Sequence, residues 1–251
     1  MAWTTRFFAV ITATMLCACG AVLPTWTQPR SGVPLTLKTA YGTEAVAYVA
    51  GPDEATIGIV VLHDRFGLDK YTLDAADRLA ATGYRVVAVD LFDGRTNSDP
   101  ELAERQARAI DPTWSEANVR AALSYLNETP RKLGVIGWGF GGGVAMFAST
   151  IGDLPVNAVV NYYGPVPTDT RGFTRVRTAV MAVFGANDPA LPEATIKAFE
   201  NGMRVFKHPL AILRSDQPRG FANPAYPTFN DGAEQAAWKR VTEFLAENIR
   251  P

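Results

Sequence analysis

The sequence predicts a single α/β domain in which a mostly parallel central sheet carries helices on both faces. Short apolar runs rich in β-branched residues alternate along the chain with longer segments whose apolar residues recur at helical spacing. The chain has 251 residues and an apolar content of 47%, which is enough for one ordinary core. Because strands that alternate with helices usually pair in parallel, this order favours a sheet covered on both sides.

The strands and helices can be assigned in order along the chain. Two short strands at 33–39 and 44–49, separated by Tyr41 and Gly42, predict an opening hairpin. Residues 56–62 form a continuous apolar run, which is typical of a strand buried on both faces. Further strands are expected at 85–91, 133–137, 156–162, 179–185 and 210–214, and helices at about 71–81, 100–109, 115–128, 141–150, 192–203 and 231–248.

The N-terminal segment is expected to direct the protein to its location. Arg6 precedes an apolar stretch, 7–18, that has the length of a signal-peptide core and is too short for a mature transmembrane helix. Residues 16–20 resemble a bacterial lipoprotein box, in which cleavage occurs before a cysteine that is then lipidated, here Cys19. The alternative is an ordinary secretory signal cleaved near Gly20.

This reading divides the chain into a signal peptide at 1–18, a lipidated tether at 19–32 and a folded domain at 33–251. The resemblance to lipoproteins implies export and attachment to a membrane of the cell envelope through the lipid on Cys19. Because Gly20 rather than Asp follows the cysteine, it implies the outer membrane if the cell is Gram-negative.

Composition excludes several classes of function. Both cysteines, Cys17 and Cys19, precede the folded domain, so the domain has no thiol for a disulfide, a metal cluster or cysteine catalysis. The net charge is -1 and no basic run occurs, so a nucleic-acid partner is not expected. The sequence also shows no metal-ligand cluster, phosphate loop or dinucleotide fingerprint, and therefore no cofactor is expected.

A glycine-rich segment at 134–143 has the pattern of a nucleophile elbow, the sharp strand-to-helix turn that exposes a Ser or Cys above a sheet. Gly137 and Gly141 keep the frame of this pattern, but Gly139 stands where the nucleophile is expected. Glycine adopts a positive φ without a Cβ penalty, so we expect the turn to form without strain. The sequence therefore predicts an elbow that lacks its reacting atom.

From about residue 33 to the end, the chain resembles the dienelactone hydrolase family of the α/β-hydrolase fold. The resemblance is carried by several separated motifs in the same order as in the family, at 60–68, 77–92, 134–143, 161–164, 184–189 and 219–223. It implies the α/β-hydrolase fold and a family activity on esters or lactones. The order of the motifs makes this fold assignment specific.

The resemblance also assigns the three catalytic positions of the family to this chain. The nucleophile, the acid and the base fall on Gly139, Asp188 and Arg219. Arginine does not deprotonate in proteins, so Arg219 cannot act as a general base. With two of the three groups replaced, the inherited hydrolysis is not expected, and we expect Asp188 and Arg219 to pair instead.

The two histidines and Asp64 are further candidates for catalytic residues. His63 lies at the carboxyl end of its strand, where open α/β sheets bind ligands, and a rival hypothesis has it activate water with Asp64 or Asp188. The simpler alternative is that His63 is a packed, hydrogen-bonded loop residue. Asp64 stands where the family commonly has Glu, a carboxylate that can influence the resting nucleophile, and with Gly139 opposite we expect that particular task to have no object. His208 precedes its strand and lies far from the catalytic end.

Three hypotheses of function remain. The backbone amides of Arg65 and Phe140, which the resemblance places in the oxyanion hole, could join Arg219 in binding a small carboxylate without hydrolysing it. The second hypothesis is an ester or lactone hydrolase that works through His63. The third is an envelope interaction protein that uses the fold as a scaffold.

Overall fold

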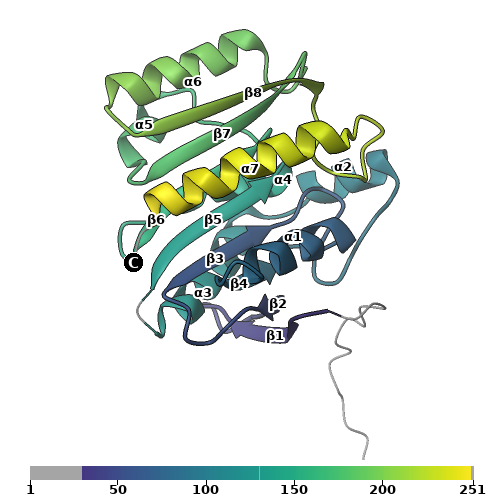
Figure 1. Cartoon of the computed structure of the whole chain (residues 1–251), viewed down its shortest axis with the longest axis vertical. Coiled ribbons are helices and arrows are strands. Elements are labelled where there is room, and N and C mark those ends of the chain that lie inside the picture. The colour runs from purple at the N-terminus through teal and green to yellow at the C-terminus, as the bar shows by residue number, and fades with distance from the viewer. Residues whose placement is uncertain (1–29, 130, 250–251) are drawn as a thin grey trace, which may run out of the picture.

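The central sheet organises the whole domain (Figure 1). The computed structural model describes residues 30–129 and 131–249, in which eight strands follow the order β1-β2-β4-β3-β5-β6-β7-β8. Their bounds are β1 Val33–Lys38, β2 Glu44–Ala50, β3 Ile57–Leu62, β4 Arg85–Val89, β5 Lys132–Trp138, β6 Val156–Tyr162, β7 Ala179–Ala186 and β8 Leu210–Pro218.

The sheet is antiparallel at one edge and parallel elsewhere. β1 pairs with β2, and β2 with β4, in antiparallel register, whereas every pair from β4 to β8 is parallel. The predicted hairpin joins β1 and β2, and Gly42 supplies a positive φ of 76° in its turn. The prediction of a mostly parallel sheet in one α/β domain is confirmed.

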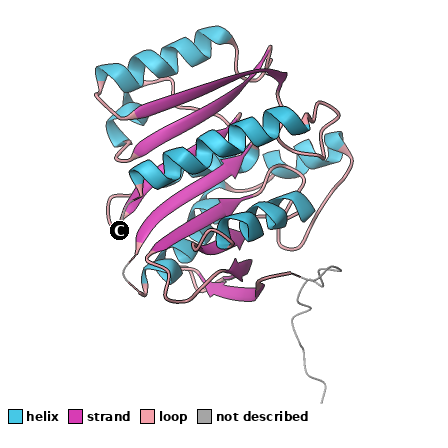
Figure 2. Cartoon of the chain, in the orientation of Figure 1, coloured by secondary structure: helices cyan, strands magenta, loops and turns pink. Residues whose placement is uncertain are grey.

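Helices cover both faces of the sheet, as Figures 1 and 2 show. On one face, α1 and α7 bury Leu73, Leu79, Val241 and Leu245 against the sheet, and on the other the core includes side chains of α3, α4 and α6. The helices are α1 Lys70–Ala80, α2 Pro100–Arg108, α3 Pro112–Asn127, α4 Phe140–Ala148, α5 Thr170–Arg175, α6 Glu193–Val205 and α7 Asp231–Asn248. Among the described residues, no helix is both long enough and apolar enough to cross a bilayer.

The fold positions the candidate site at the carboxyl edge of the sheet. Because β3, β5, β6, β7 and β8 run in parallel, the loops that leave them emerge on the same side. Those loops carry Asp64, Gly139, Asp188 and Arg219, which are widely separated in the sequence.

Two details differ from the sequence-based assignment. Helix α5 was not predicted, because its six residues are too few for a periodic apolar pattern, although Asp169 caps it by accepting from Gly172 N at 2.7 Å. Residues 30–32, assigned to the tether, contact the domain: Arg30 Nη1 lies 2.6 Å from Asp74 Oδ1. The predicted signal peptide and Cys19, the predicted lipidation site, lie outside the described residues.

Candidate functional site

The elbow between β5 and α4 keeps the backbone of a nucleophile turn. Gly139 has φ 50° and ψ −109°, a conformation that strains an L side chain, and its N–H donates to Tyr162 O at 2.8 Å. A Cβ at Gly137 would lie 2.2 Å from Gly141 O, and one at Gly141 would lie 2.4 Å from His63 O. Glycine is therefore required at both flanking positions, because strand, helix and the loop after β3 approach one another closely.

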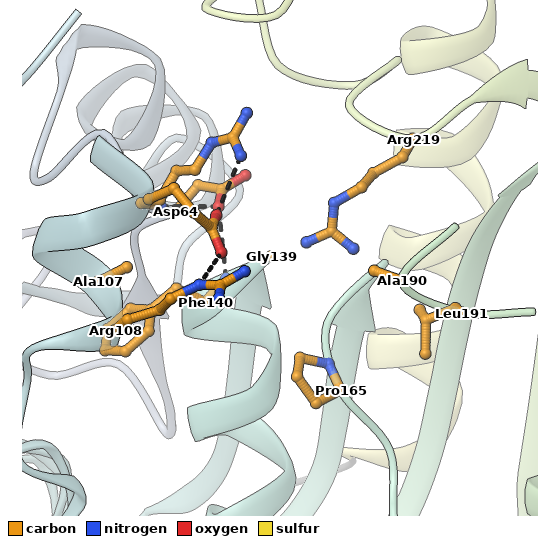
Figure 3. Close-up of a pocket in the computed structure, with 11 residues that line it drawn as sticks. Asp64, Ala107, Arg108, Gly139, Phe140, Pro165, Ala190, Leu191 and Arg219 are labelled. Carbon is orange, nitrogen blue, oxygen red and sulfur yellow. Dashed lines mark hydrogen bonds and ion pairs between the residues drawn. The ribbon is translucent and has the colours of Figure 1, made fainter. Parts of the chain in front are cut away.

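The carboxylate of Asp64 occupies the space above Gly139. A Cβ built on Gly139 would lie 2.1 Å from Asp64 Oδ1, which is far inside van der Waals contact. Oδ1 accepts from Arg65 N at 2.7 Å and from Phe140 N at 3.3 Å, and Oδ2 accepts from Tyr226 Oη at 2.8 Å. Figure 3 shows Asp64 beside Gly139 and Phe140. The side chain that fills the nucleophile position thus comes from the chain itself.

This arrangement gives Asp64 a structural role at the elbow in place of an influence on a nucleophile. Its negative charge lies at the N-terminus of α4, where the helix dipole favours an anion. The amides of Arg65 and Phe140 converge as an oxyanion hole would, but the oxygen between them belongs to Asp64. Burial, followed by the proximity of Asp64, raises the pKa of Tyr226, so its hydroxyl stays protonated and donates to the carboxylate.

Asp188 and Arg219 form the pair that the sequence predicted. Arg219 Nη1 donates to Asp188 Oδ2 at 3.1 Å and to Tyr163 O at 2.6 Å, and Asp188 Oδ1 accepts from Ala190 N at 2.8 Å. Although burial opposes its charge, the carboxylate of Asp188 and other nearby groups raise the pKa of Arg219 above its usual value. Arg219 is therefore a fixed cation.

His63 is enclosed and uses both ring nitrogens. Its side chain has no exposed surface, Nε2 accepts from Leu91 N at 2.9 Å, and Nδ1 lies 2.7 Å from Asp64 O. These partners require a proton on Nδ1 and none on Nε2. Burial lowers the pKa of His63, which keeps the ring neutral. The geometry fits a packed loop residue and leaves no nitrogen available to a water in the cleft.

His208 is also held by a structural contact. Its Nε2 lies 2.8 Å from Phe173 O, just before β8 begins and away from the carboxyl edge of the sheet. The sequence prediction that it lies far from the elbow agrees with this position.

A pocket of about 320 Å³ separates the elbow from the Asp188–Arg219 pair. Figure 3 shows the guanidinium of Arg219 pointing into it from the side opposite Asp64. Helix α2 adds Glu104 and Arg108 to the lining, and Glu104 accepts from Arg65 Nη1 at 3.0 Å and from Arg108 Nε at 2.8 Å. These two arginines lower the pKa of Glu104, Arg108 more strongly, so the carboxylate stays charged.

Sequence reasoning missed three residues of this site: Glu104, Arg108 and Tyr226. The spacing of Glu104 and Arg108 indicates only a helical ion pair, and nothing in the sequence shows that their helix faces the elbow. Within residues 30–129 and 131–249, no group of three or more His, Cys, Asp and Glu side chains is arranged to hold a metal ion.

The comparisons with known proteins agree on one family. The model of the dienelactone hydrolase family matches residues 45–249. Protein usf of Aquifex pyrophilus is 28% identical over 83% of this chain and 95% of its own length. The carboxymethylenebutenolidase homolog of Rattus norvegicus is 30% identical over 58% of this chain and 62% of its own.

Solved structures show the same fold. A dienelactone hydrolase-like promiscuous phosphotriesterase from metagenomic libraries superposes with a TM-score of 0.75 at 22% identity, over 88% of this chain and all (100%) of its own. At this identity the likeness concerns the fold, which is the α/β-hydrolase fold that the sequence predicted.

Proposed function

The chain belongs to the dienelactone hydrolase family, and we propose that it is a non-hydrolytic member that binds a small carboxylate. One observation carries the first half of this proposal: a Cβ at Gly139 would lie 2.1 Å from Asp64 Oδ1. A substrate carbonyl would therefore find no nucleophile at the elbow and would meet a carboxylate between the oxyanion-hole amides. Arg219 at the base position removes the second requirement for the family's reaction.

The second half of the proposal depends on Arg219. Its two hydrogen bonds to described residues both use Nη1, which orients the guanidinium while the rest of it faces the pocket. A preorganised guanidinium binds a carboxylate with little further loss of side-chain freedom. The pocket of about 320 Å³ is large enough for a small acid.

Binding is tested by titrating the purified protein with phenylacetate and following heat or ligand NMR signals. We expect saturable binding that weakens roughly tenfold in Arg219→Gln, since the variant removes the charge but keeps a polar side chain. Arg214→Gln is the matched control, because Arg214 lies on β8, the strand that precedes the Arg219 loop, and pairs with Glu193 and Glu200 away from the pocket. Equal affinity in Arg219→Gln and the parent would contradict carboxylate binding at this site.

Hydrolysis is tested with para-nitrophenyl acetate and a small unsaturated lactone. We expect no turnover above the uncatalysed rate, because the residues at the elbow and base positions supply neither a nucleophile nor a base. Turnover that disappears in His63→Gln would overturn the proposal in favour of a hydrolase acting through His63.

We further propose that the protein is exported and anchored to a membrane by a lipid on Cys19. The support comes from the apolar segment 7–18 and the lipoprotein-like box at 16–20. In the native host, the full-length protein should partition into the detergent phase, and Cys19→Ser should remain in the aqueous phase. Identical partitioning of the two proteins would argue against lipidation.

A further inference from the structure

A second hollow, apolar in character, adjoins the charged pocket. It has a volume of about 300 Å³ and is lined by residues before and at the start of α3, by one side of α4 and by Pro165. Phe140 and Pro165 line both hollows, so the two are neighbours across these side chains. The side chains of Ile110, Val144 and Phe147 give the second hollow its apolar surface.

One buried polar side chain that lines this hollow, and a second on the same helix behind it, lack partners among the described residues. Ser115 lines the hollow with 2% of its surface exposed, and its Oγ has no hydrogen-bond partner. Asn118 lies one turn further along the same face of α3, is fully buried, and has neither Oδ1 nor Nδ2 paired.

Some other buried polar groups among the described residues also lack a partner, Trp138 Nε1 and Tyr163 Oη among them, but other side-chain hydroxyls find one within the chain. Ser149 and Thr150, at the C-terminal end of α4, donate to Met146 O at 2.6 Å and to Phe147 O at 2.8 Å. Buried polar groups are generally satisfied, because an unpaired one costs free energy relative to water. Because Ser115 lines the hollow, its unpaired Oγ indicates a hydrogen-bonding group that arrives with a ligand.

We propose that the apolar hollow binds the body of the ligand whose carboxylate pairs with Arg219, and that this ligand is an aromatic hydroxy acid. This proposal rests on the carboxylate-binding function proposed above. The ring lies against Phe140 and Phe147, which favours an aromatic body. The hydroxyl of the ligand bonds with Ser115 Oγ, which lines the hollow.

The test compares acetate, phenylacetate and para-hydroxyphenylacetate by titration of the intact protein. Burial of the ring should make phenylacetate bind roughly tenfold more tightly than acetate. The added hydroxyl should contribute a further gain of about fivefold, the size of one ordinary hydrogen bond.

Variants separate the parts of the proposal. Val144→Phe fills the hollow and should remove the advantage of both aromatic acids over acetate, whereas Val205→Phe, at a position 58% exposed on α6, should leave it unchanged. Ser115→Ala should remove only the gain due to the ligand hydroxyl. Its melting temperature should equal or exceed that of the parent, as should that of Asn118→Leu, because each substitution deletes an unpaired buried polar group.

Each contrary result has a distinct meaning. If acids bind through Arg219 but the ring adds no affinity, the aromatic subsite is refuted and the proposed function stands. If no acid binds in an Arg219-dependent manner, the proposed function fails and this inference fails with it. A fall in melting temperature in Ser115→Ala and Asn118→Leu would show that internal water satisfies the pair as part of the structure, which would overturn the assignment of a ligand hydroxyl.

Discussion

At the elbow, the position expected for a nucleophile is occupied by the buried carboxylate of Asp64, whereas at the loop after β8 the position expected for a base presents the charge of Arg219 to a pocket. Asp64 is 2% exposed and holds three hydrogen bonds, while the side chain of Arg219 is 25% exposed. At the elbow, every charged side-chain oxygen is therefore hydrogen-bonded within the protein. In the later loop, the guanidinium of Arg219 faces a pocket. The comparison teaches that two loops at the same edge of one sheet can differ in this way: one buries its charge against backbone amides, and the other exposes its charge to a pocket.

The largest effect is expected when a side chain is returned to the elbow. Gly139→Ser should destabilise the fold by roughly 3 kcal/mol, because its Cβ displaces Asp64 and strains a backbone with positive φ. Urea unfolding measures this loss. In the Asp64→Ala background the same substitution should cost clearly less, since the colliding carboxylate is gone. Simple additivity of the two changes would contradict the role of Asp64 as the group that fills the elbow.

A pH dependence is expected from His63, which joins the elbow to its surroundings. Burial lowers the pKa of the folded-state imidazole below its unfolded value of about 6.5. Below that pH the unfolded chain binds a proton that the folded protein does not, so stability is retained above it and falls as the solution becomes more acidic. The loss should approach about 1.4 kcal/mol per pH unit within this window. Urea titrations at several pH values measure the slope, and His63→Gln should reduce it; an unchanged slope would assign the effect to other groups.

A smaller effect is expected at the opposite side of the pocket. Asp188→Asn should lower stability by about 1 kcal/mol, because Arg219 loses its charged partner but stays partly solvated. The same change should strengthen phenylacetate binding severalfold, since no internal carboxylate then competes for the guanidinium. Thermal unfolding and ligand titration together test this prediction, with Asp153→Asn, at a surface ion pair, as the control. Weaker binding in Asp188→Asn would show that the pair is needed to orient Arg219.

Most of the fold could be predicted because its signals are local. All eight strands and six of the helices follow apolar periodicity, and their observed bounds lie within a few residues of those expected. Helix α5 was not predicted, because a helix of six residues has fewer than two turns in which apolar residues can recur. The pairing of Asp188 with Arg219 was also predictable, since the resemblance to a family placed both loops at one edge of the sheet.

The contents of the site were less predictable because they depend on distant contacts. Tyr226 bonds to Asp64 across 162 positions of sequence, and Phe140 bonds to it across 76. Glu104 and Arg108 have ordinary helical spacing and acquire a place in the pocket only because α2 packs near the elbow. Considered singly, Glu104 and Arg108 do not differ from other charged residues on the surface of a helix.

The sequence by itself determined the order of strands and helices, and it places glycine and arginine where the family resemblance assigns the nucleophile and the base. Local periodicity encodes the former, and the identities at Gly139 and Arg219 are sufficient for the latter. Only the tertiary structure decided what replaces them. The oxyanion-hole amides point to Asp64, His63 is sealed, and Arg219 faces a pocket, because each of these outcomes depends on which loops the sheet brings within hydrogen-bonding distance.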